Sequence, residues 1–270
     1  MYKYDFHTHT DFSGDCEFPM EIMIEHAINN NFKKLCFTDH FDYDFPSTEL
    51  SFQLDIPAYY NKFMELKEKY NSKIDLLFGI EVGIQPHIYD VIIKTINKYP
   101  FDFVIGSTHV INKQDPYCGE YYKNKTKKEA YDKYLKEILY NVNNFNDYNV
   151  YGHLDYIIRY GNYEDKKLYY KDYSDIIDAI LLKIIESNHG IEINTSGYRQ
   201  NFKEPHPNVD IIKRYGELGG EIITIGSDSH NPEHLAYNFD KACNLLLKNG
   251  FKYFTVFKER KPEFIKIPCV

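Results

Sequence analysis

The first residues that could do chemistry are His7 and His9, in the stretch "KYDFHTHTDFSGDC" over residues 3–16. In an extended segment, side chains alternate between faces with a period of two, so both imidazoles point to the same side and can bind one metal ion. A single His-x-His motif is weak evidence, because isolated motif matches often have no function. The pair is informative only if further ligands approach it from elsewhere in the chain.

Such residues follow the later predicted strands, one strand after another. The motifs "FTDH", "GIEVG", "GSTHV", "YGHLD", "IEIN" and "GSDSH" supply Asp39, His40, Glu81, His109, His153, Asp155, Glu192, Asn194, Asp228 and His230. In a parallel α/β barrel, the C-terminal ends of all strands meet on one face. Burying many ionisable groups together costs free energy unless they are paired or bind cations, so we expect a metal centre. Nitrogen and oxygen ligands without an obvious thiolate suit zinc, manganese or iron.

The elements that must position these residues alternate along the chain. Short β-branched and aromatic runs predict strands over residues 2–6, 34–39, 75–82, 101–108, 150–155, 190–196 and 222–228. Helical spacing predicts helices over residues 19–31, 57–70, 88–98, 127–145, 173–188, 209–218 and 232–249. About seven βα units favour an α/β fold with a closed or nearly closed barrel, with an open doubly wound sheet as the alternative.

No linker or shift of composition divides the 270 residues, so we expect a single domain over residues 1–270. The polar and aromatic loop over residues 112–126 is in a position where loops often cover the active face of a barrel. The formal net charge of −8 argues against a long nucleic-acid track, although it allows a small anionic substrate.

Cysteine usage and hydropathy predict a soluble cytoplasmic protein with no membrane partner. The five cysteines are odd in number and include no CxxC pair, which argues against a disulfide framework; we expect Cys16 and Cys36 to be packing residues. The N-terminus lacks a signal-peptide pattern, and no run of about 18 apolar residues occurs. The sequence does not indicate an oligomeric state.

The ordered motifs "DFHTHTDFSGD", "FTDHF", "GIEVGIQ", "GSTHVI", "YGHLDYIIRYG", "IEINTSGYR" and "GSDSHNP" resemble the PHP family, named for polymerase and histidinol phosphatase. The likeness covers nearly the whole chain and is strongest to the monofunctional histidinol-phosphatase branch. This resemblance implies a distorted (β/α)7 barrel with up to three metal ions at its C-terminal face.

The resemblance also implies a set of metal ligands. The first ion would be held by His7, His9, Glu81 and Asp228, and Glu81 would bridge to a second ion held by His109 and His153. The third ion would be held by Asp15, His40 and His230. Other branches of the family often have histidine in place of Asp15, a departure that keeps an anionic oxygen ligand and bears on metal preference.

The expected chemistry is hydrolysis at phosphorus. Two ions about 3.5–4 Å apart can lower the pKa of a shared water and stabilise the oxygens of an in-line displacement. A bridging hydroxide would then be the nucleophile, with Glu81 and Asp228 as the catalytic carboxylates that hold its metals. Phosphoryl transfer needs positioning and charge stabilisation, so a third cation and nearby arginines would complete the site.

Two arginines follow strand ends that carry site residues. Arg159 in "DYIIRYG" and Arg199 in "TSGYRQ" have the planar fork that binds two phosphate oxygens at once, and we expect both to bind phosphate. His206 in "EPHPN" is a further candidate substrate contact or acid, or else a loop residue. The remaining polar residues at strand ends are expected to orient histidine ligands, or else to cap helices and turns: Asp39, Asp155, Glu192 and Asn194. Asp11 is expected in a turn.

The leading hypothesis is a metal-dependent phosphomonoesterase that hydrolyses L-histidinol phosphate to L-histidinol and phosphate in histidine biosynthesis, as the resemblance implies. Alternatives are a PHP-family phosphoesterase acting on another small phosphorylated substrate or a nucleotide, and a non-catalytic metal-binding barrel. A metal-dependent amidohydrolase is disfavoured because no lysine falls at a predicted strand end.

Overall fold

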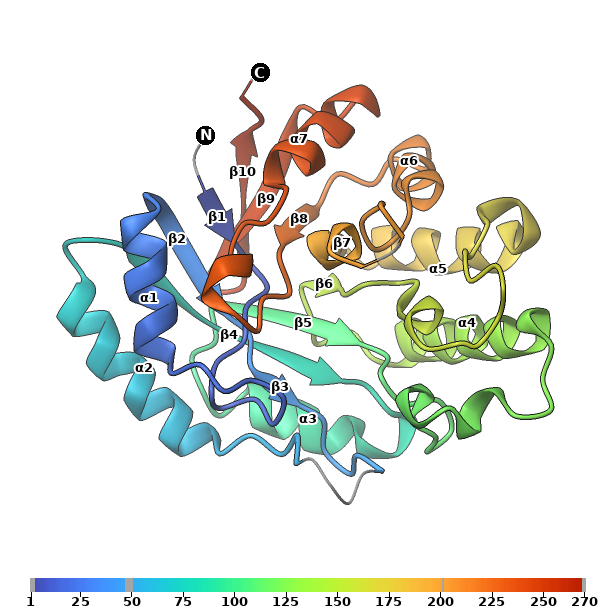
Figure 1. The fold of residues 1–270 in the computed structure, drawn as a ribbon, viewed down its shortest axis with the longest axis horizontal. Coiled ribbons are helices and arrows are strands. Elements are labelled where there is room, and N and C mark those ends of the chain that lie inside the picture. Colours follow the sequence, from blue (N-terminus) through green and yellow to red (C-terminus); the bar gives the residue numbers. More distant parts are fainter. Residues whose placement is uncertain (1–2, 47–50, 201, 269–270) are drawn as a thin grey trace.

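The computed structural model describes residues 3–46, 51–200 and 202–268 and has a parallel β-barrel surrounded by helices (Figure 1). Seven strands form the barrel, each paired in parallel with the next: β1 Lys3–Asp5, β2 Phe32–Phe37, β4 Asp75–Gly83, β5 Phe103–Ser107, β6 Val150–Tyr151, β7 Gly190–Asn194 and β8 Ile223–Gly226. The two-residue strand β3 (His40–Phe41) pairs with the second half of β4. The strands follow one another around the barrel in chain order, as successive βα units require.

The barrel closes between β1 and β8 through segments that lie at or beyond the ends of these strands. The backbone N–H of Phe6 donates to the carbonyl of Ile225 over 3.3 Å, and Thr8 forms a parallel bridge with Ser229. The seam therefore joins the His-x-His segment directly to the loop after β8. The predicted distorted (β/α)7 barrel is confirmed.

The helices lie on the outside of the barrel (Figure 1). Their bounds are α1 Met20–Asn29, α2 Ile56–Tyr70, α3 Tyr89–Ile96, α4 Lys127–Asn144, α5 Ser174–Glu186, α6 Val209–Glu217 and α7 Phe239–Lys248. Local signals explain where they start: Pro57 occupies the first turn of α2, and Thr126 with Glu129 forms a capping box on α4. None of the described helices is long and apolar enough to cross a membrane.

The helix predicted over residues 232–249 is wrong in its first part. Residues Pro232–His234 form a short 3₁₀ turn, and α7 begins only at Phe239. Between them, Ala236 and Asn238 have φ angles of 51° and 55°. These left-handed conformations cannot continue a right-handed helix, and the local spacing of apolar residues does not predict them.

The prediction also missed a C-terminal hairpin. Strands β9 (Tyr253–Lys258) and β10 (Lys261–Lys266) pair antiparallel, and the ring of Phe257 lies 5.1 Å from that of Phe103 in the barrel. Conversely, the strands predicted over residues 150–155 and 190–196 are too long, because β6 ends at Tyr151 and β7 at Asn194. The residues that follow both strands form turns instead, and these turns carry Arg159 and Ser196.

Buried aromatic and aliphatic side chains form one hydrophobic core cluster. Cys16, Cys36 and Cys243 are buried thiols without a disulfide, as expected of packing residues. Cys269 and Tyr2, the first residue of the first predicted strand, lie outside the described residues. The single cluster supports the expectation of one domain, which stays a prediction.

Phe78 on β4 tests the core. Its ring is almost fully buried and stacks on Phe101 at a centroid distance of 4.5 Å. We expect Phe78→Ala to lower the free energy of unfolding by about 3–5 kcal/mol, because it removes apolar contacts and leaves a cavity. Denaturant titration measures the loss. The matched control is Phe264→Ala on β10, where the side chain is 48% exposed and the expected change is within about 0.5 kcal/mol. Equal losses of unfolding free energy in Phe78→Ala and Phe264→Ala would contradict the placement of Phe78 in the core.

Candidate active site

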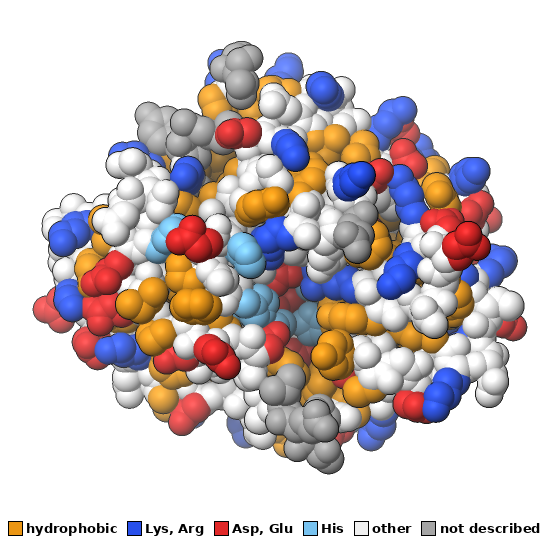
Figure 2. Space-filling view, viewed as in Figure 1, with side chains coloured by type: hydrophobic (Ala, Val, Ile, Leu, Met, Phe, Trp, Pro, Cys, Tyr) orange, Lys and Arg blue, Asp and Glu red, His pale blue; other side chains and the backbone are white. Residues whose placement is uncertain are grey.

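A cavity of about 410 Å³ opens at the C-terminal ends of the barrel strands. Figure 2 shows a hollow near the middle of this face, with histidine, acidic and basic side chains inside it and hydrophobic side chains around it. Its polar lining residues are Asp15, His40, Asp42, His109, Asp115, Cys118, His153, Arg159, Asp228 and His230, and its aromatic and proline lining residues are Phe45, Pro46, Phe52, Tyr117, Tyr156 and Tyr160. Asp115, Tyr117 and Cys118 come from the loop that was expected to cover the active face.

Potential metal ligands converge at the bottom of this cavity. The described residues include five groups of three side chains whose ligand atoms all lie within 4.8 Å of one another. These groups contain every predicted ligand except Asp15, whose Oδ2 lies 3.2 Å from Nε2 of His230 and 3.7 Å from Nε2 of His40. The structure therefore brings the nine predicted ligands together from segments spread over more than 200 residues of chain.

Glu81, on β4, is at the centre of the ligand cluster. Its Oε1 lies 3.0 Å from Nε2 of His153 and 3.3 Å from Nε2 of His109. Its Oε2 lies 3.1 Å from Nε2 of His7 and 3.1 Å from Nδ1 of His40. Nε2 of His9 also lies 3.6 Å from Oε2, so each oxygen faces a different set of imidazoles, as a carboxylate that bridges two metal ions requires.

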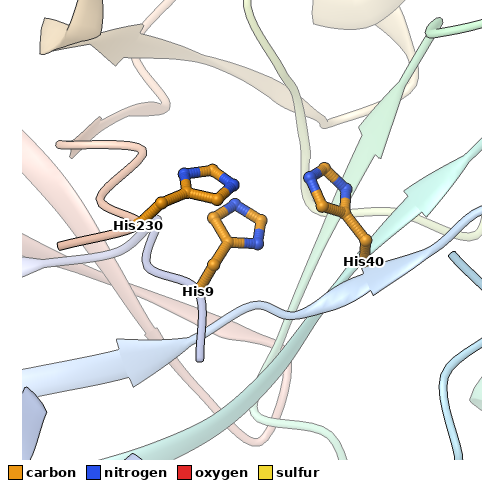
Figure 3. A group of neighbouring side chains, drawn as sticks. All are labelled: His9, His40 and His230. Atoms are coloured by element: carbon orange, nitrogen blue, oxygen red, sulfur yellow. The ribbon is translucent and has the colours of Figure 1, made fainter. Parts of the chain in front are cut away.

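A second cluster is made by His9, His40 and His230 (Figure 3). The ring of His9 lies 4.1 Å from that of His230 and 4.3 Å from that of His40, measured between centroids. His9 Nε2, His40 Nδ1 and His230 Nε2 are buried and form no hydrogen bond of good geometry, although each lies 3.1–3.5 Å from a carboxylate oxygen. Buried polar atoms are nearly always hydrogen-bonded in native proteins, so these three nitrogens fit a site that binds a cation.

The charges of the site suit metal binding. Burial alone would raise the pKa of Glu81, but the neighbouring imidazoles of His7, His40 and His109 hold it well below its ordinary value, so the carboxylate is ionised. Burial, together with the nearby His230 and His40, lowers the pKa of His9 to about 3. His9 is therefore neutral and keeps a lone pair for a metal ion.

The pKa values of His7 and His109 are shifted in the opposite direction from that of His9. Burial lowers the pKa of both, but carboxylates outweigh it and raise the pKa well above the ordinary value: Glu192 and Glu81 around His7, Asp42 and Glu81 around His109. A metal ion that binds these imidazoles must displace protons, which is the usual coupling between metal affinity and pH.

Further side chains orient the histidines by binding their second ring nitrogen. Glu192 Oε2 lies 2.8 Å from Nδ1 of His7, and its Oε1 accepts from the backbone N–H of His153 over 2.8 Å. Ser13 Oγ lies 3.1 Å from Nδ1 of His9 and donates to Asp39 over 2.7 Å. Such contacts fix the ring orientation of a metal-binding histidine. The placement of Glu192 and Asp39 fits the orienting role expected of them.

Asp42 is a site residue that the sequence reasoning missed. Its Oδ1 lies 2.7 Å from Nδ1 of His109, and its Oδ2 is 3.4 Å from Nδ1 of His40. Gly83 makes room for it, because a Cβ at that position would lie 1.9 Å from Asp42 Oδ1. A signal was present in "FTDHFDYD", since Asp42 is two residues after His40 and shares its side of an extended segment.

The two predicted phosphate-binding arginines are placed differently. Arg159 lines the cavity, and its Nη2 donates to Asp228 Oδ2 over 2.9 Å and to Ser196 Oγ over 3.0 Å. Arg199 is not among the lining residues and donates to the carbonyls of Ser227 and Asp228 over 2.8 and 2.9 Å. Asp228 has a left-handed φ of 52°, so Arg199 stabilises a strained turn that carries a predicted metal ligand.

His206 is buried outside the cavity. Its Nδ1 lies 2.7 Å from Asp155 Oδ1, and its Nε2 lies 3.1 Å from Gln200 Oε1. Both ring nitrogens are therefore engaged within the protein. Asn194 lies nearer the ligands, because its Nδ2 donates to Asp228 Oδ2 over 3.1 Å. Asp11 lies in an exposed turn, as expected.

Residues 5–196 match the PHP domain family. The chain belongs to this family. Its curated relatives include the histidinol-phosphatase of Lactococcus lactis subsp. lactis, which is 36% identical over 97% of this chain and 96% of the relative. The probable histidinol-phosphatase of Clostridium acetobutylicum is 38% identical over 90% of this chain and 94% of the relative.

Solved structures agree with this PHP-domain assignment. The crystal structure of histidinol phosphate phosphatase from Lactococcus lactis, complexed with zinc, L-histidinol and phosphate, has a TM-score of 0.90 and 35% sequence identity, and the match covers 97% of this chain and 98% of that one. A structure from Listeria monocytogenes, with a TM-score of 0.76 and 20% identity over 89% of this chain and 100% of that one, shares the fold.

The contact between Asp42 and His109 generates a prediction about metal affinity. We expect Asp42→Ala to weaken zinc binding about 10–100-fold, because the ring of His109 loses the carboxylate that orients it. Competition with a chromophoric chelator measures the affinity. The matched control is Asp44→Ala, an exposed aspartate that pairs with His87 and does not line the cavity. Unchanged zinc affinity in Asp42→Ala would show that Asp42 does not orient a metal ligand.

Proposed function

We propose that this PHP-domain protein is a metal-dependent phosphomonoesterase that hydrolyses L-histidinol phosphate to L-histidinol and phosphate. The observation that carries the proposal is the convergence of the Glu81 ligand cluster and Arg159 on one cavity. The chain is also similar over its whole length to a histidinol phosphate phosphatase whose structure holds zinc, L-histidinol and phosphate. The substrate is thus a small phosphorylated alcohol, and we place the reaction in the cytoplasm, as a step of histidine biosynthesis.

We assign three metal ions to the site, with zinc favoured over manganese or iron by the relative's complex. His7, His9, Glu81 and Asp228 would hold the first, Glu81, His109 and His153 the second, and Asp15, His40 and His230 the third. When bound, such ions lower the pKa of water and stabilise negative charge on phosphoryl oxygens. The central position of Glu81, with Oε2 near His7 and His9 and Oε1 near His109 and His153, supports its bridging role.

The protein's own residues would bind and orient the substrate. Arg159 has five N–H donors, and only its Nη2 is engaged with Asp228 and Ser196. Its Nε is buried and forms no hydrogen bond. The remaining donors suit phosphoryl oxygens in the cavity, and the ring of Tyr156, 5.0 Å from the guanidinium, limits where that group can move. Glu81 and Asp228, both with a pKa held, despite burial, well below the ordinary value by neighbouring positive groups, would hold the metals as ionised carboxylates.

The decisive experiment compares substrates and metals. The purified protein is stripped with a chelator, reloaded with zinc, manganese or iron, and assayed for phosphate release. The substrates are histidinol phosphate, a simple alkyl phosphate, a nucleoside monophosphate and a phosphodiester. We expect metal-dependent turnover with a strong preference for histidinol phosphate. A preference for another phosphoester would favour a related phosphoesterase, and a full metal load without turnover would favour a metal-binding barrel.

Arg159 tests the phosphate site. We expect Arg159→Ala to lower kcat/KM for histidinol phosphate by about 100-fold or more, the usual effect of removing a donor that stabilises transition-state charge. Arg159→Lys should recover only part of the loss, because lysine lacks the planar fork. The control is Arg214→Ala, which breaks an arginine–carboxylate pair with Asp178 on the outer helices and should leave kcat/KM unchanged. If Arg159→Ala retains wild-type kcat/KM, Arg159 does not bind phosphate.

A further inference from the structure

We infer that His206 and Asp155 form a positioning pair that holds Arg159 against Asp228, rather than contacting the substrate. The inference rests on the proposed function, because it concerns how the phosphate side of that site is built. It also revises the sequence-based expectation for His206, since neither residue of the pair lines the cavity.

The first arm of the pair runs through Asp155. This residue directly precedes the 3₁₀ turn η4 (Tyr156–Arg159), and its carbonyl accepts from the N–H of Ile158 over 3.0 Å. Its carboxylate pairs with His206 Nδ1 at 2.7 Å and accepts from the backbone N–H of Asn208 over 3.1 Å. One buried carboxylate thus ties the turn that carries Arg159 to the segment 206–208.

The second arm runs through the backbone of His206. Its N–H donates to the carbonyl of Asn194 over 2.8 Å, and the N–H of Asn194 donates back over 2.7 Å. Asn194 Oδ1 then accepts from the N–H and the hydroxyl of Ser196, the second residue of turn η6 (Thr195–Tyr198). Gly197 permits this close approach, because a Cβ there would lie 2.2 Å from the carbonyl oxygen of Glu204.

Both arms meet at the guanidinium of Arg159. Its Nη2 is held by Ser196 Oγ at 3.0 Å from one arm and by Asp228 Oδ2 at 2.9 Å, while η4 itself is held by the other arm. His206 and Asp155 are both fully buried. A buried histidine–aspartate pair is costly to desolvate and must be well satisfied by its partners, as this pair is. The pair does not line the cavity itself, and two of its connections lead to Arg159, which does.

Loss of the His206–Asp155 pair should weaken phosphate binding more than metal binding. Without the pair, η4 and η6 lose their common anchor, so Arg159 is less well placed to meet a phosphoryl group. The predicted ligands on β3 and β4 and those that follow β1 and β5 form no hydrogen bond or ion pair with His206 or Asp155 among the described residues, and the second arm reaches only Asp228, through Asn194. Most of the predicted ligand set should therefore keep its metal. We therefore expect phosphate affinity to fall and KM to rise while zinc stays bound.

A double-mutant cycle tests the inference with inorganic phosphate as the probe. The zinc-loaded wild type, His206→Gln, Arg159→Ala and the double variant are titrated with phosphate by calorimetry, and KM and kcat for histidinol phosphate are measured alongside. We expect His206→Gln to weaken phosphate binding about 10-fold, since small misplacements of a binding group are costly. In the Arg159→Ala background the same substitution should change the affinity less than about 2-fold, because its effect passes through Arg159.

Two controls separate positioning from general stability. His189→Gln removes a histidine ring that packs on Tyr148 just before β7, away from the cavity, and should leave phosphate affinity unchanged. Asp155→Asn keeps the side-chain volume and should repeat the phosphate defect, which keeps the test valid if His206→Gln does not fold. Zinc content and thermal melting are recorded for every variant.

The outcomes are distinct. Equal losses from His206→Gln in the two backgrounds would mean that His206 acts independently of Arg159, which overturns the inference while the proposed function stands. Wild-type phosphate affinity in both His206→Gln and Asp155→Asn would overturn it too. A zinc-loaded wild type that neither binds phosphate nor releases it from histidinol phosphate overturns the proposed function together with this inference.

Discussion

The structure depends on one buried carboxylate, that of Glu81, surrounded by imidazoles. A charge in the interior of a barrel is costly unless opposite charges or cations compensate for it. Here five histidines from four different segments lie 3.0–3.6 Å from its two oxygens. Each of these histidines must therefore be placed by its own strand or loop, and the rest of the barrel meets that requirement.

The seam between β1 and β8 is the second constraint. Closure through the segments that follow these strands brings His7 and His9 beside Asp228 and His230, residues that are far apart in the sequence. The strain of the left-handed Asp228 is held by Arg199, which donates to two carbonyls of the same turn. Geometry that is locally unfavourable is often found at functional sites, where the surrounding structure stabilises it.

Two groups of side chains surround the predicted metal ligands: one orients the histidines, and the other holds Arg159. Carboxylates and a serine hold the second nitrogen of several histidines, which leaves the first nitrogen aimed at the centre. Arg159 lies on the turn η4 and is held by hydrogen bonds to Ser196 on the turn η6 and to Asp228. The network around the predicted metal ligands and the network around Arg159 are joined at two points. Asn194 donates to Glu192 over 3.1 Å, and the two oxygens of Asp228 face His9 and Arg159.

Much of this could be predicted, because parallel strands deliver the residues at their C-terminal ends to one face, and short motifs mark those ends. The barrel, its seven strands and six of the helices follow from that regularity together with the family resemblance. The nine predicted ligands lie close together at the strand ends, and their role stays a prediction. The seventh helix was misjudged at its start, since the left-handed residues Ala236 and Asn238 depend on contacts with distant segments. One such contact is the bond from the N–H of Ala236 to Asp5.

The sequence by itself determined the types of ligand, their order and their placement at strand ends, because these are local properties with a fixed period. Only the tertiary structure decided which partner each polar group meets. Asp42 faces His109, Arg199 turns to backbone carbonyls, and His206 is buried against Asp155. These pairings join residues 28 to 67 positions apart, and their geometry is set by how the loops pack, which no local pattern of residues encodes.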